Sequence, residues 1–468
     1  MATQKKRPAT LGALKSSGYV TIPVREEMRR NLIGRMEAGK ALFPGIIGFE
    51  DTVIPQIENA ILAGQDLILL GERGQAKSRI IRGMVELLDD AIPIVAGSEI
   101  NDDPFDPASK FGRDAVEEHG DDTPIAWVGR DRRYGEKLAT PDISIADLIG
   151  DIDPIRIAEG RYLSDEMAIH YGLIPRTNRG IFCINELPDL AERIQVGLFN
   201  LMEERDVQIK GHLVRLPLDV MVVASANPED YTNRGRIITP LKDRYGAQVR
   251  THYPREAKQE IAIMEAEHTV FRETADRVKV PSYIKEILAE FTALARKHPE
   301  INQRSGVSVR VSIANYETVL ANALRRAITS KEERAVPRPT DLPYIIASTL
   351  GKVELETMEE GRETKVLDDL TKRAVLNVFD RYFSAADFDG LVTVFEEGAS
   401  LETGAEMPSK VYKDLLGKFP GFGDALKKFK VGEDVAATAS VMEFILEGLH
   451  LNRRLNRDKV EGGYRYHA

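Results

Sequence analysis

The sequence predicts an α/β domain, built on a parallel sheet with helices on both faces, that is followed by an all-helical region. Two observations carry this prediction. Between residues 41 and about 254, short apolar runs that end in glycine or polar turns alternate with helical stretches. After about Pro254 the apolar runs stop and only helical patterns continue. Such alternation is typical of strands that are buried on both faces and joined by crossover helices.

The expected elements follow one another in a regular order. Apolar runs that suit buried strands cover 66–70, 91–96, 180–184 and 220–224, and helical stretches cover 78–88 and 190–204. Residues 102–175 form an acidic, glycine-rich segment with the only tryptophan, which we expect to be a surface insertion. Further helices are expected at 283–297, 312–329, 340–350, 365–383, 409–418 and 431–451, and the last polar residues are expected to fray.

Composition narrows the class of protein. The 468 residues include 64 basic and 74 acidic side chains, a net charge of −10, so the chain offers no overall basic face for duplex DNA. A single cysteine excludes a disulfide framework. The start is basic without an apolar stretch behind it, and no window approaches the roughly 18 apolar residues of a spanning helix. We therefore expect a cytoplasmic protein without a membrane span and without direct DNA binding.

The strongest chemical signal is a glycine-rich loop between an expected strand and an expected helix. Its residues are Gly71, Glu72, Arg73, Gly74, Gln75, Ala76, Lys77 and Ser78. In a phosphate-binding loop, backbone N–H groups surround the β-phosphate of ATP, the lysine reaches the β and γ phosphates, and the serine ligates Mg²⁺. Ala76 stands where the pattern has glycine, which is tolerable if φ is negative there. The alternative is a glycine-rich turn with a solvated lysine.

Polar residues follow two other apolar runs. Asn185 and Glu186 come after the run 181–184, and Asn227 comes shortly after the run 220–224. In an ATPase of this design, the first position usually holds an aspartate that orients the water shell of Mg²⁺, and the second a glutamate that activates the attacking water. Asn185 can still accept a hydrogen bond from a metal-bound water, but it lacks the charge. Asn227 could position the attacking water. Alternatively, Glu186 is an exposed strand-end carboxylate and Asn227 opens a turn.

Together these motifs resemble those of the AAA+ ATPases, which are P-loop NTPases with a helical lid domain. The likeness is closer to the helix-2-insert branch, in particular to the ATPase (I) subunit of magnesium chelatase and to MoxR-type ATPases. The segments that carry it are 43–44, 47–48, 103–106, 148–153, 177–180 and 200–211, and the resemblance spans about 43–350. MoxR-type loops often have alanine before the lysine, as Ala76 is here, whereas Asn185 departs from the usual aspartate.

The resemblance implies a domain scheme and two further roles. The scheme has an N-terminal tail (1–40), an AAA+ domain (41–257) with the 102–175 insertion and a helix-2 hairpin at about 205–216, a lid (258–352) and a C-terminal helical extension (353–468). Arg244 would be an arginine finger inserted into a neighbouring subunit's site, and Arg310 would reach the γ-phosphate from the lid. Either arginine could instead be a surface ion-pair residue. The extension could dock a partner or simply bury its own core.

The leading hypothesis is a Mg²⁺-dependent, ATP-hydrolysing ring ATPase that remodels or activates a partner protein. Family likeness implies a hexamer and a separate partner with a von Willebrand A domain. This chain has no Asp-x-Ser-x-Ser motif, so we expect any such domain on another polypeptide. One alternative is a true magnesium-chelatase subunit that drives Mg²⁺ insertion into protoporphyrin. Another is a nucleotide-responsive scaffold with little turnover because of Asn185. An enhancer-binding transcriptional activator is disfavoured, since the sequence shows neither a Gly-Ala-Phe-Thr-Gly-Ala loop nor a clear helix-turn-helix.

Overall fold

The computed structural model describes residues 7–159, 162, 165–209, 215–227, 236–272, 274–303, 305–356 and 361–468. The chain divides into two compact units, Met1–His252 and Tyr253–Ala468. The first unit holds a parallel sheet with the glycine-rich loop, and the second is mainly helical.

A five-stranded parallel sheet forms the centre of the first unit. Its strands lie in the order β11–β1–β10–β7–β4, and all four neighbouring pairs are parallel. Their bounds are β1 (Leu67–Leu70), β4 (Tyr134–Leu138), β7 (Gly180–Asn185), β10 (Val220–Ala226) and β11 (Ala247–Arg250). Neighbours in this order are far apart along the chain, as crossover connections require. The predicted α/β class is therefore confirmed.

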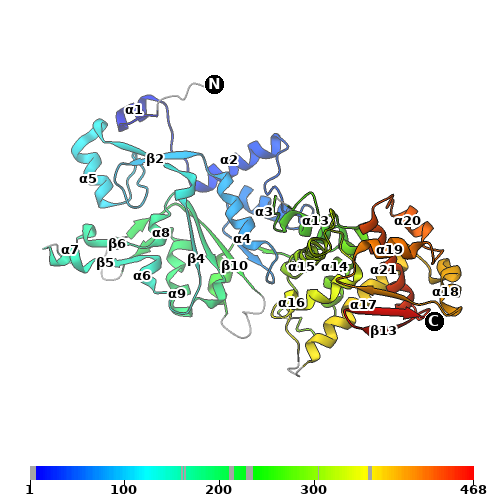
Figure 1. The fold of residues 1–468 in the computed structure, drawn as a ribbon. Coiled ribbons are helices and arrows are strands. Elements are labelled where there is room, and N and C mark those ends of the chain that lie inside the picture. Colours follow the sequence, from blue (N-terminus) through cyan, green and yellow to red (C-terminus); the bar gives the residue numbers. More distant parts are fainter. Residues whose placement is uncertain are drawn as a thin grey trace. The chain divides into compact units, whose positions relative to one another are not determined.

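Helices cover both faces of this sheet. Those of the first unit are α1 (Leu11–Ser16), α2 (Val24–Glu37), α3 (Val53–Leu62), α4 (Lys77–Gly83), α5 (Lys110–His119), α6 (Ile145–Leu148), α7 (Pro154–Ala158), α8 (Leu173–Arg176), α9 (Glu192–Gly197), α10 (Phe199–Glu203) and α12 (Thr239–Arg244). Leu67 and Cys183 belong to one core with α2, α3 and α4. Ile68 and Phe182 face the opposite way, into a core with α8, α9 and α10. Figure 1 shows α8 and α9 on one side of β4 and β10, and α2, α3 and α4 on the other.

Two parts of the sheet differ from the sequence prediction. The run 91–96 is predicted among the parallel strands, but β2 (Ala91–Val95) pairs antiparallel with β3 (Ile125–Gly129) in a separate sheet. The edge strand β4 comes instead from the 102–175 segment, and Ala139, Ile149 and Ile174 of that segment lie in the core. The segment is therefore more than a surface insertion. Its strand escaped detection because an edge strand can carry polar residues, here Glu136 and Lys137.

Two short antiparallel pairs complete the first unit. β5 (Gly150–Ile152) pairs with β6 (Ile169–Tyr171), and β8 (Asp206–Gln208) pairs with β9 (Arg215–Pro217). The second pair coincides with the predicted helix-2 hairpin, of which residues 210–214 lie outside the described residues.

The segment 1–40, predicted as a tail, contains a helix of the core. Met28 and Leu32 of α2 are buried against the sheet, and burial of each such side chain stabilises the fold by about 1.5–3 kcal/mol. Glu27 of the same helix is also buried, and it accepts a hydrogen bond from Arg133 Nη1 at 2.7 Å. Arg133 additionally donates from Nε to the carbonyl of Arg179 at 2.7 Å. A paired and hydrogen-bonded charge of this kind ties α2 to the residues before β4 and β7.

One hydrophobic core, from Met264 to Tyr466, runs through the second unit. Its helices are α13 (Ala257–Glu267), α14 (Ser282–Ala295), α15 (Val309–Thr329), α16 (Ile345–Thr349), α17 (Arg362–Tyr382), α18 (Asp389–Glu396), α19 (Ser409–Leu416), α20 (Gly423–Lys428) and α21 (Val435–Leu451). Tyr283 of α14 stacks on Phe444 of α21 with ring centroids 4.3 Å apart. The regions predicted as a lid and as an extension therefore share their buried side chains.

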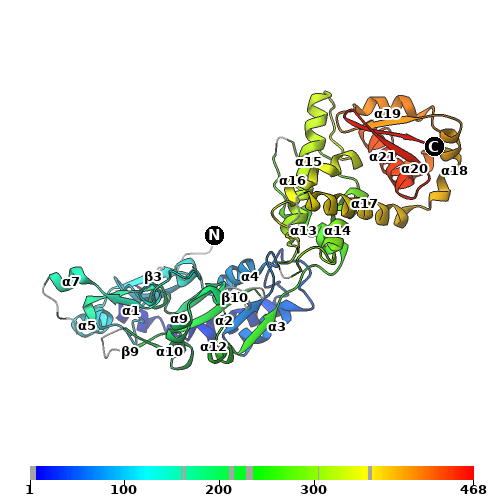
Figure 2. The same cartoon turned by 90° about the horizontal axis from the view of Figure 1, so that it is seen from below.

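A small antiparallel sheet ends the second unit, where the sequence predicts frayed residues. β12 (Leu401–Gly404), β14 (Gly463–His467) and β13 (Asn456–Val460) lie in that order, and Figure 2 shows these strands beside α19 and α21. Tyr466 is buried, and its hydroxyl donates to Glu447 Oε2 at 2.6 Å. The prediction of a frayed end is wrong, because pairing with β12 satisfies the backbone of this polar segment.

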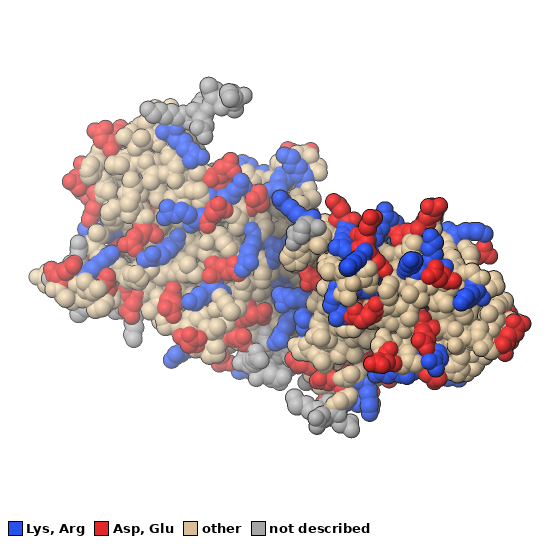
Figure 3. Space-filling view, in the orientation of Figure 1, with Lys and Arg blue, Asp and Glu red and all other residues tan. Residues whose placement is uncertain are grey.

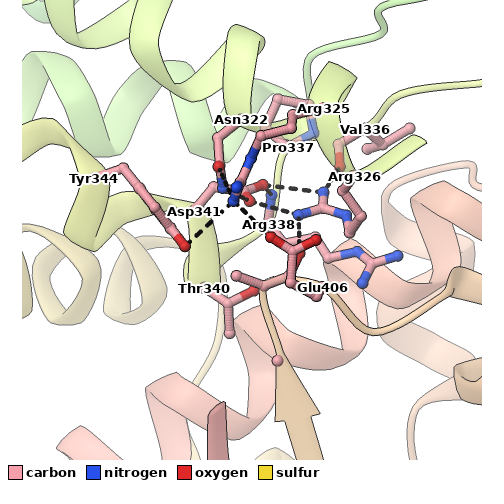
Figure 4. A network of polar contacts seen from close by, with 12 residues as sticks. Asn322, Arg325, Arg326, Val336, Pro337, Arg338, Thr340, Asp341, Tyr344 and Glu406 are labelled. Carbon is pink, nitrogen blue, oxygen red and sulfur yellow. Dashed lines mark hydrogen bonds and ion pairs between the residues drawn. The ribbon is translucent and has the colours of Figure 1, made fainter. Parts of the chain in front are cut away.

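A buried network of charges lies within the second unit (Figure 4). Arg326 of α15 donates to both carboxylate oxygens of Asp341, at 2.5 and 3.0 Å, and to the carbonyl of Val336 at 2.8 Å. Asn322 Nδ2 adds a hydrogen bond to Asp341 Oδ1 at 2.6 Å. Both charged side chains are at most 2% exposed. Such burial is tolerated only because each charge is paired and hydrogen-bonded.

The surface carries both signs of charge. Figure 3 shows acidic and basic side chains interspersed over the visible face of each unit. On this face the net charge of −10 is not gathered into one acidic patch. Over the part of the chain that the structure describes, no helix is both long and apolar enough to cross a membrane.

Candidate active site

The glycine-rich loop lies at the carboxyl end of β1. That strand ends at Leu70, and α4 begins at Lys77, which is the strand, loop and helix order that the sequence predicts. The N–H of Gly71 donates to the carbonyl of Ala226 at 3.1 Å, so the start of the loop is fixed to β10. Gly74 has a φ of 76°, which glycine adopts without steric cost.

Ala76 also has left-handed backbone geometry. Its φ is 55° and its ψ is 12°, so the condition under which alanine would fit here without strain, a negative φ, is not met. This conformation costs a residue with a Cβ about 1–2 kcal/mol. The carbonyl of Ala76 accepts the N–H of Ile80 at 3.0 Å, so the residue opens α4 directly from the strained position. The turn from loop to helix thus imposes the backbone angle, whatever residue stands there, and such strain is typical of functional loops.

Lys77 points into its own loop. The side chain is buried, with 7% of the residue exposed. Its Nζ donates to the carbonyl oxygens of Gly71 and Glu72, the second at 2.9 Å. An ammonium in this place fits a bound phosphate, whose oxygens would replace the carbonyls as charge-assisted acceptors.

A cavity of about 460 Å³ opens beside the loop, between the ends of β1 and β11. Gly71, Gln75 and Thr251 line it, and Thr251 Oγ1 donates to Gln75 Oε1 at 2.6 Å. A Cβ on Gly71 would lie 1.8 Å from Thr251 Oγ1, so only glycine fits at this position. The volume is within the range of small-ligand sites, about 300–1,000 Å³. Loop and cavity together fit a nucleotide.

The carboxyl ends of β1, β7 and β10, which the sequence predicts to carry the site, lie side by side. Leu70 of β1 pairs with Ala226 of β10, and Ala224 of β10 pairs with Ile184 of β7. The loop after β1, the polar residues after β7 and the polar residue after β10 therefore share one edge of the sheet. In open parallel sheets, ligands bind at this edge.

Asn185 belongs to a hydrogen-bond chain across three strands. Its Nδ2 donates to Glu136 Oε1 of β4 at 2.5 Å, and its Oδ1 accepts from Ser225 Oγ of β10 at 3.1 Å. Ser225 Oγ in turn accepts the backbone N–H of Glu186 at 3.2 Å. The amide of Asn185 is therefore held at both ends.

Sequence reasoning missed Glu136. Arg82 of α4 donates hydrogen bonds to both carboxylate oxygens of Glu136, at 2.8 and 2.9 Å. The hydroxyl of Tyr134 donates to the same carboxylate at 2.9 Å. The hydrogen bond from Arg82 is the main cause that holds the pKa of Glu136 below its usual value, although partial burial opposes it. A negative charge thus stands beside Asn185. The contact between Glu136 and Asn185 could have been predicted only by recognising β4 as the neighbour of β7, because the two residues are far apart in the sequence.

Glu186 and Asn227 each directly follow a residue of this hydrogen-bonded network or of its strands, Glu186 after β7 and Asn227 after β10. Glu186 follows β7 directly, is partly exposed, and has left-handed backbone geometry with a φ of 53°. Asn227 follows β10 and is 1% exposed, and no described residue donates a hydrogen bond to its Oδ1. A buried acceptor without a donor is costly unless a ligand or water supplies one. This atom therefore fits an attacking water.

The described residues also indicate how a metal would be held. They contain no group of three or more His, Cys, Asp or Glu side chains that could enclose an ion. Mg²⁺ is usually bound by one or two protein groups together with substrate phosphates, so such an enclosure is not required. Ser78 on α4 is exposed next to Lys77, and Asn185 lies in the core on the face that α4 covers. This donor set fits a nucleotide-bound Mg²⁺.

The two predicted arginines have other contacts. Arg244 of α12 pairs with Glu203 of α10 and lies 4.6 Å from the centre of the Phe199 ring. Arg310, in the second unit, is exposed near the start of α15, where its backbone N–H donates to Ser308 Oγ at 3.1 Å. Their roles at a nucleotide stay predictions.

A parallel sheet with a phosphate loop after one strand and polar residues after two neighbouring strands defines the class: a P-loop fold of the AAA+ ATPases. Within that class, the chain resembles the ATPase subunit of magnesium chelatase and MoxR-type ATPases, as its sequence motifs predict.

Two relatives that are similar in sequence support this resemblance. The magnesium-chelatase subunit ChlI of Nostoc sp. is 25% identical over 402 residues, which cover 79% of this chain and 95% of that protein. ChlI of Mesostigma viride is 28% identical over 242 residues, 48% of this chain and 61% of that protein. A solved structure, NtrX of Brucella abortus in complex with ATP, aligns over 79% of this chain and 68% of that one, with a TM-score of 0.41 and 14% identity. No protein-family model matches the chain.

Proposed function

We propose that this chain is a ring-forming ATPase that binds and hydrolyses ATP to remodel or activate a partner protein. One observation carries the proposal: Lys77, Glu186 and Asn227 come from three adjacent strand ends at one edge of the sheet. These are the positions from which a lysine, a general base and a water-positioning amide would act on one triphosphate.

Each residue has a distinct task in this proposal. The backbone of 71–76 and the Lys77 ammonium hold the phosphates. Ser78 and Asn185 hold the metal, and a bound Mg²⁺ supplies charge neutralisation at the β and γ phosphates. Glu186 takes the proton of the attacking water, whose other hydrogen is directed by Asn227 Oδ1. The cavity beside Gly71 and Thr251 receives the remainder of the nucleotide.

The ring follows from the proposed arginine finger. Arg244 would complete the site of a neighbouring subunit, and Arg310 would act from the helical unit, so that hydrolysis would move one part of the assembly against another. The β8–β9 pair would be the element that works on the client. By resemblance, we propose a hexamer and a separate partner with a von Willebrand A domain.

Nucleotide binding and single-turnover hydrolysis test the function. The wild-type chain should bind ATP and hydrolyse it well above the spontaneous rate in Mg²⁺. Glu186→Gln should bind ATP equally well and lower the hydrolysis rate about 10²- to 10⁴-fold, the usual worth of a general base. Glu192→Gln is the matched control, since this carboxylate is exposed and pairs with Arg236 on the surface. Equal rates for Glu186→Gln and the control would contradict the assignment.

Two alternatives predict different results, one in these assays and one in an assay of metal insertion. A chain that binds ATP but hydrolyses it no faster than water is the nucleotide-responsive scaffold, a reading that Asn185 motivates. A true magnesium-chelatase subunit would support Mg²⁺ insertion into protoporphyrin when the partner subunits are added. The relatives named ChlI motivate this second test.

A further inference from the structure

The residue at the proposed metal position is an amide, and a carboxylate touches it from the next strand. Asn185 Nδ2 lies 2.5 Å from Glu136 Oε1. Glu136 lies opposite Cys183 in the β4–β7 pair, so its side chain emerges on the sheet face that also carries Asn185. The contact joins two strands that are about 50 residues apart in the chain.

The contact determines which end of the amide faces which group. Because the NH₂ end donates to a carboxylate, Oδ1 is the end that can accept. It accepts the hydroxyl of Ser225 at 3.1 Å and the thiol of Cys183, a weak donor, at 3.6 Å. A charged acceptor on Nδ2 strengthens the hydrogen bonds that Oδ1 receives, since linked hydrogen bonds polarise one another. The pair thus presents a carbonyl oxygen backed by a negative charge.

The negative charge is built into the fold. Arg82 and Tyr134 both donate to Glu136, and the side chain of Glu136 is 21% exposed. Arg82 and Ser78 are four residues apart on α4 and so lie on the same side of that helix. The carboxylate is therefore held next to the helix that carries the proposed metal-ligating serine.

We propose that Glu136 is a positioning residue that acts through Asn185, and that the two side chains together replace the single aspartate usual at this point in such ATPases. Glu136 supplies the charge, and Asn185 Oδ1 accepts the hydrogen bond from the hydration shell of the nucleotide-bound metal. The inference rests on the proposed function.

The competing explanation is structural. In that case Glu136 only ties α4 to β4 through its ion pair with Arg82. The Arg82 side chain is 64% exposed, and pairs near the surface contribute at most about 1 kcal/mol. Losing either partner would then have the same small effect on stability and none on metal binding.

The full-length chain with a non-hydrolysable ATP analogue separates these explanations, with Mn²⁺ as the probe. Electron paramagnetic resonance measures the Mn²⁺ affinity of the ternary complex, and a fluorescent analogue measures nucleotide affinity without metal. Glu136→Gln should weaken Mn²⁺ binding about 10-fold, as loss of a second-layer partner typically does, and leave metal-free nucleotide affinity unchanged. Arg82→Ala should keep Mn²⁺ affinity within about threefold, because the carboxylate and its contact with Asn185 remain.

An exchange of the two residues provides a second test. Glu136→Gln with Asn185→Asp puts the acid back at the usual position and should restore Mn²⁺ affinity to within about threefold of wild type. Asn185→Asp alone places two carboxylates in contact and should lower the melting temperature below that of the double variant. Unchanged Mn²⁺ affinity in Glu136→Gln, or equal losses in Glu136→Gln and Arg82→Ala, would overturn the inference alone. A wild-type chain that binds no nucleotide would overturn the proposed function and this inference with it.

Discussion

Lys77 Nζ donates to the carbonyl of Glu72 at 2.9 Å, so the lysine of the phosphate loop already points to where a phosphate would lie. A second bond, to the carbonyl of Gly71, holds it in the same direction. A hydrogen bond from a charged group is worth about 1.5–3 kcal/mol, and a phosphate is the stronger acceptor. A bound phosphate would therefore replace these carbonyls as the acceptor of the Lys77 ammonium.

Lys77→Ala should abolish ATP binding, with a loss of affinity of about 100-fold or more, because at least two charge-assisted contacts disappear. Titration with a fluorescent ATP analogue measures the loss. Lys110→Ala is the matched control in the same unit, since Lys110 is exposed and pairs with Asp114 on the surface. Unchanged affinity in Lys77→Ala would contradict the loop assignment.

Ala76→Gly should cost less stability than an ordinary Ala→Gly change in the same unit. Glycine removes the left-handed strain at Ala76, whereas Ala63 has a right-handed φ of −84°. We expect Ala63→Gly to lose about 1 kcal/mol more than Ala76→Gly. The fluorescence of Trp127, the only tryptophan, reports urea unfolding of this unit. Equal losses would show that the φ of Ala76 carries no strain.

Mixing two inactive variants should restore ATPase activity if sites are shared between subunits. Glu186→Gln lacks the base, and Arg244→Ala lacks the proposed finger, so a mixed ring contains some interfaces with both groups intact. A finger is worth about 10³- to 10⁵-fold in rate, so the regained activity is easily measured. The absence of rescue at every mixing ratio, with mixed rings shown by mass, would argue against a finger in trans.

Asp341→Asn should destabilise the second unit by about 3–5 kcal/mol, because it leaves the buried guanidinium of Arg326 without its counter-charge. The control Asp368→Asn removes an exposed carboxylate that pairs with Lys372 at 2.5 Å. We expect this control to lower the free energy of unfolding by about 0.5 kcal/mol. The helical circular-dichroism signal follows unfolding of this mainly helical unit. Similar losses of stability in both variants would contradict the inference that the network in Figure 4 stabilises the second unit.

Glu443 should make stability depend on pH. Burial raises the pKa of this carboxyl above its ordinary value of 4.5, and Arg338 lies 3.8 Å away and opposes the rise. At a pH between the unfolded and the folded pKa, the folded state therefore binds more protons at this site than the unfolded chain does. The resulting stabilisation is complete below the unfolded pKa and is lost as pH rises through the folded pKa.

Glu443→Gln cannot titrate and removes this dependence. The unfolding free energy of wild type minus that of Glu443→Gln should therefore fall as pH rises above 4.5, the ordinary pKa of this carboxyl. Circular dichroism in urea at several pH values measures the difference. A difference that rises with pH would mean that Glu443 is ionised in the fold.

Much of the first unit was predictable because its signals are local. The runs that became β1, β7 and β10 are apolar on both faces, and the polar residues that follow them mark strand ends wherever the strands lie. The edge strand β4 was not predictable, since Glu136 and Lys137 interrupt its apolar pattern. The closing strands β13 and β14 were missed for the same reason, because their polar residues read as a solvated end.

By itself, the sequence determined the order of strand, loop and helix around Lys77 and the kinds of residue that follow β7 and β10, because local patterning and glycine placement are enough for that. Only the tertiary structure decided the left-handed angle of Ala76, the burial of the Asn227 amide and the meeting of Asn185 with Glu136. These depend on which strands become neighbours, and neighbours in a parallel sheet are chosen by packing between segments that are distant in the chain.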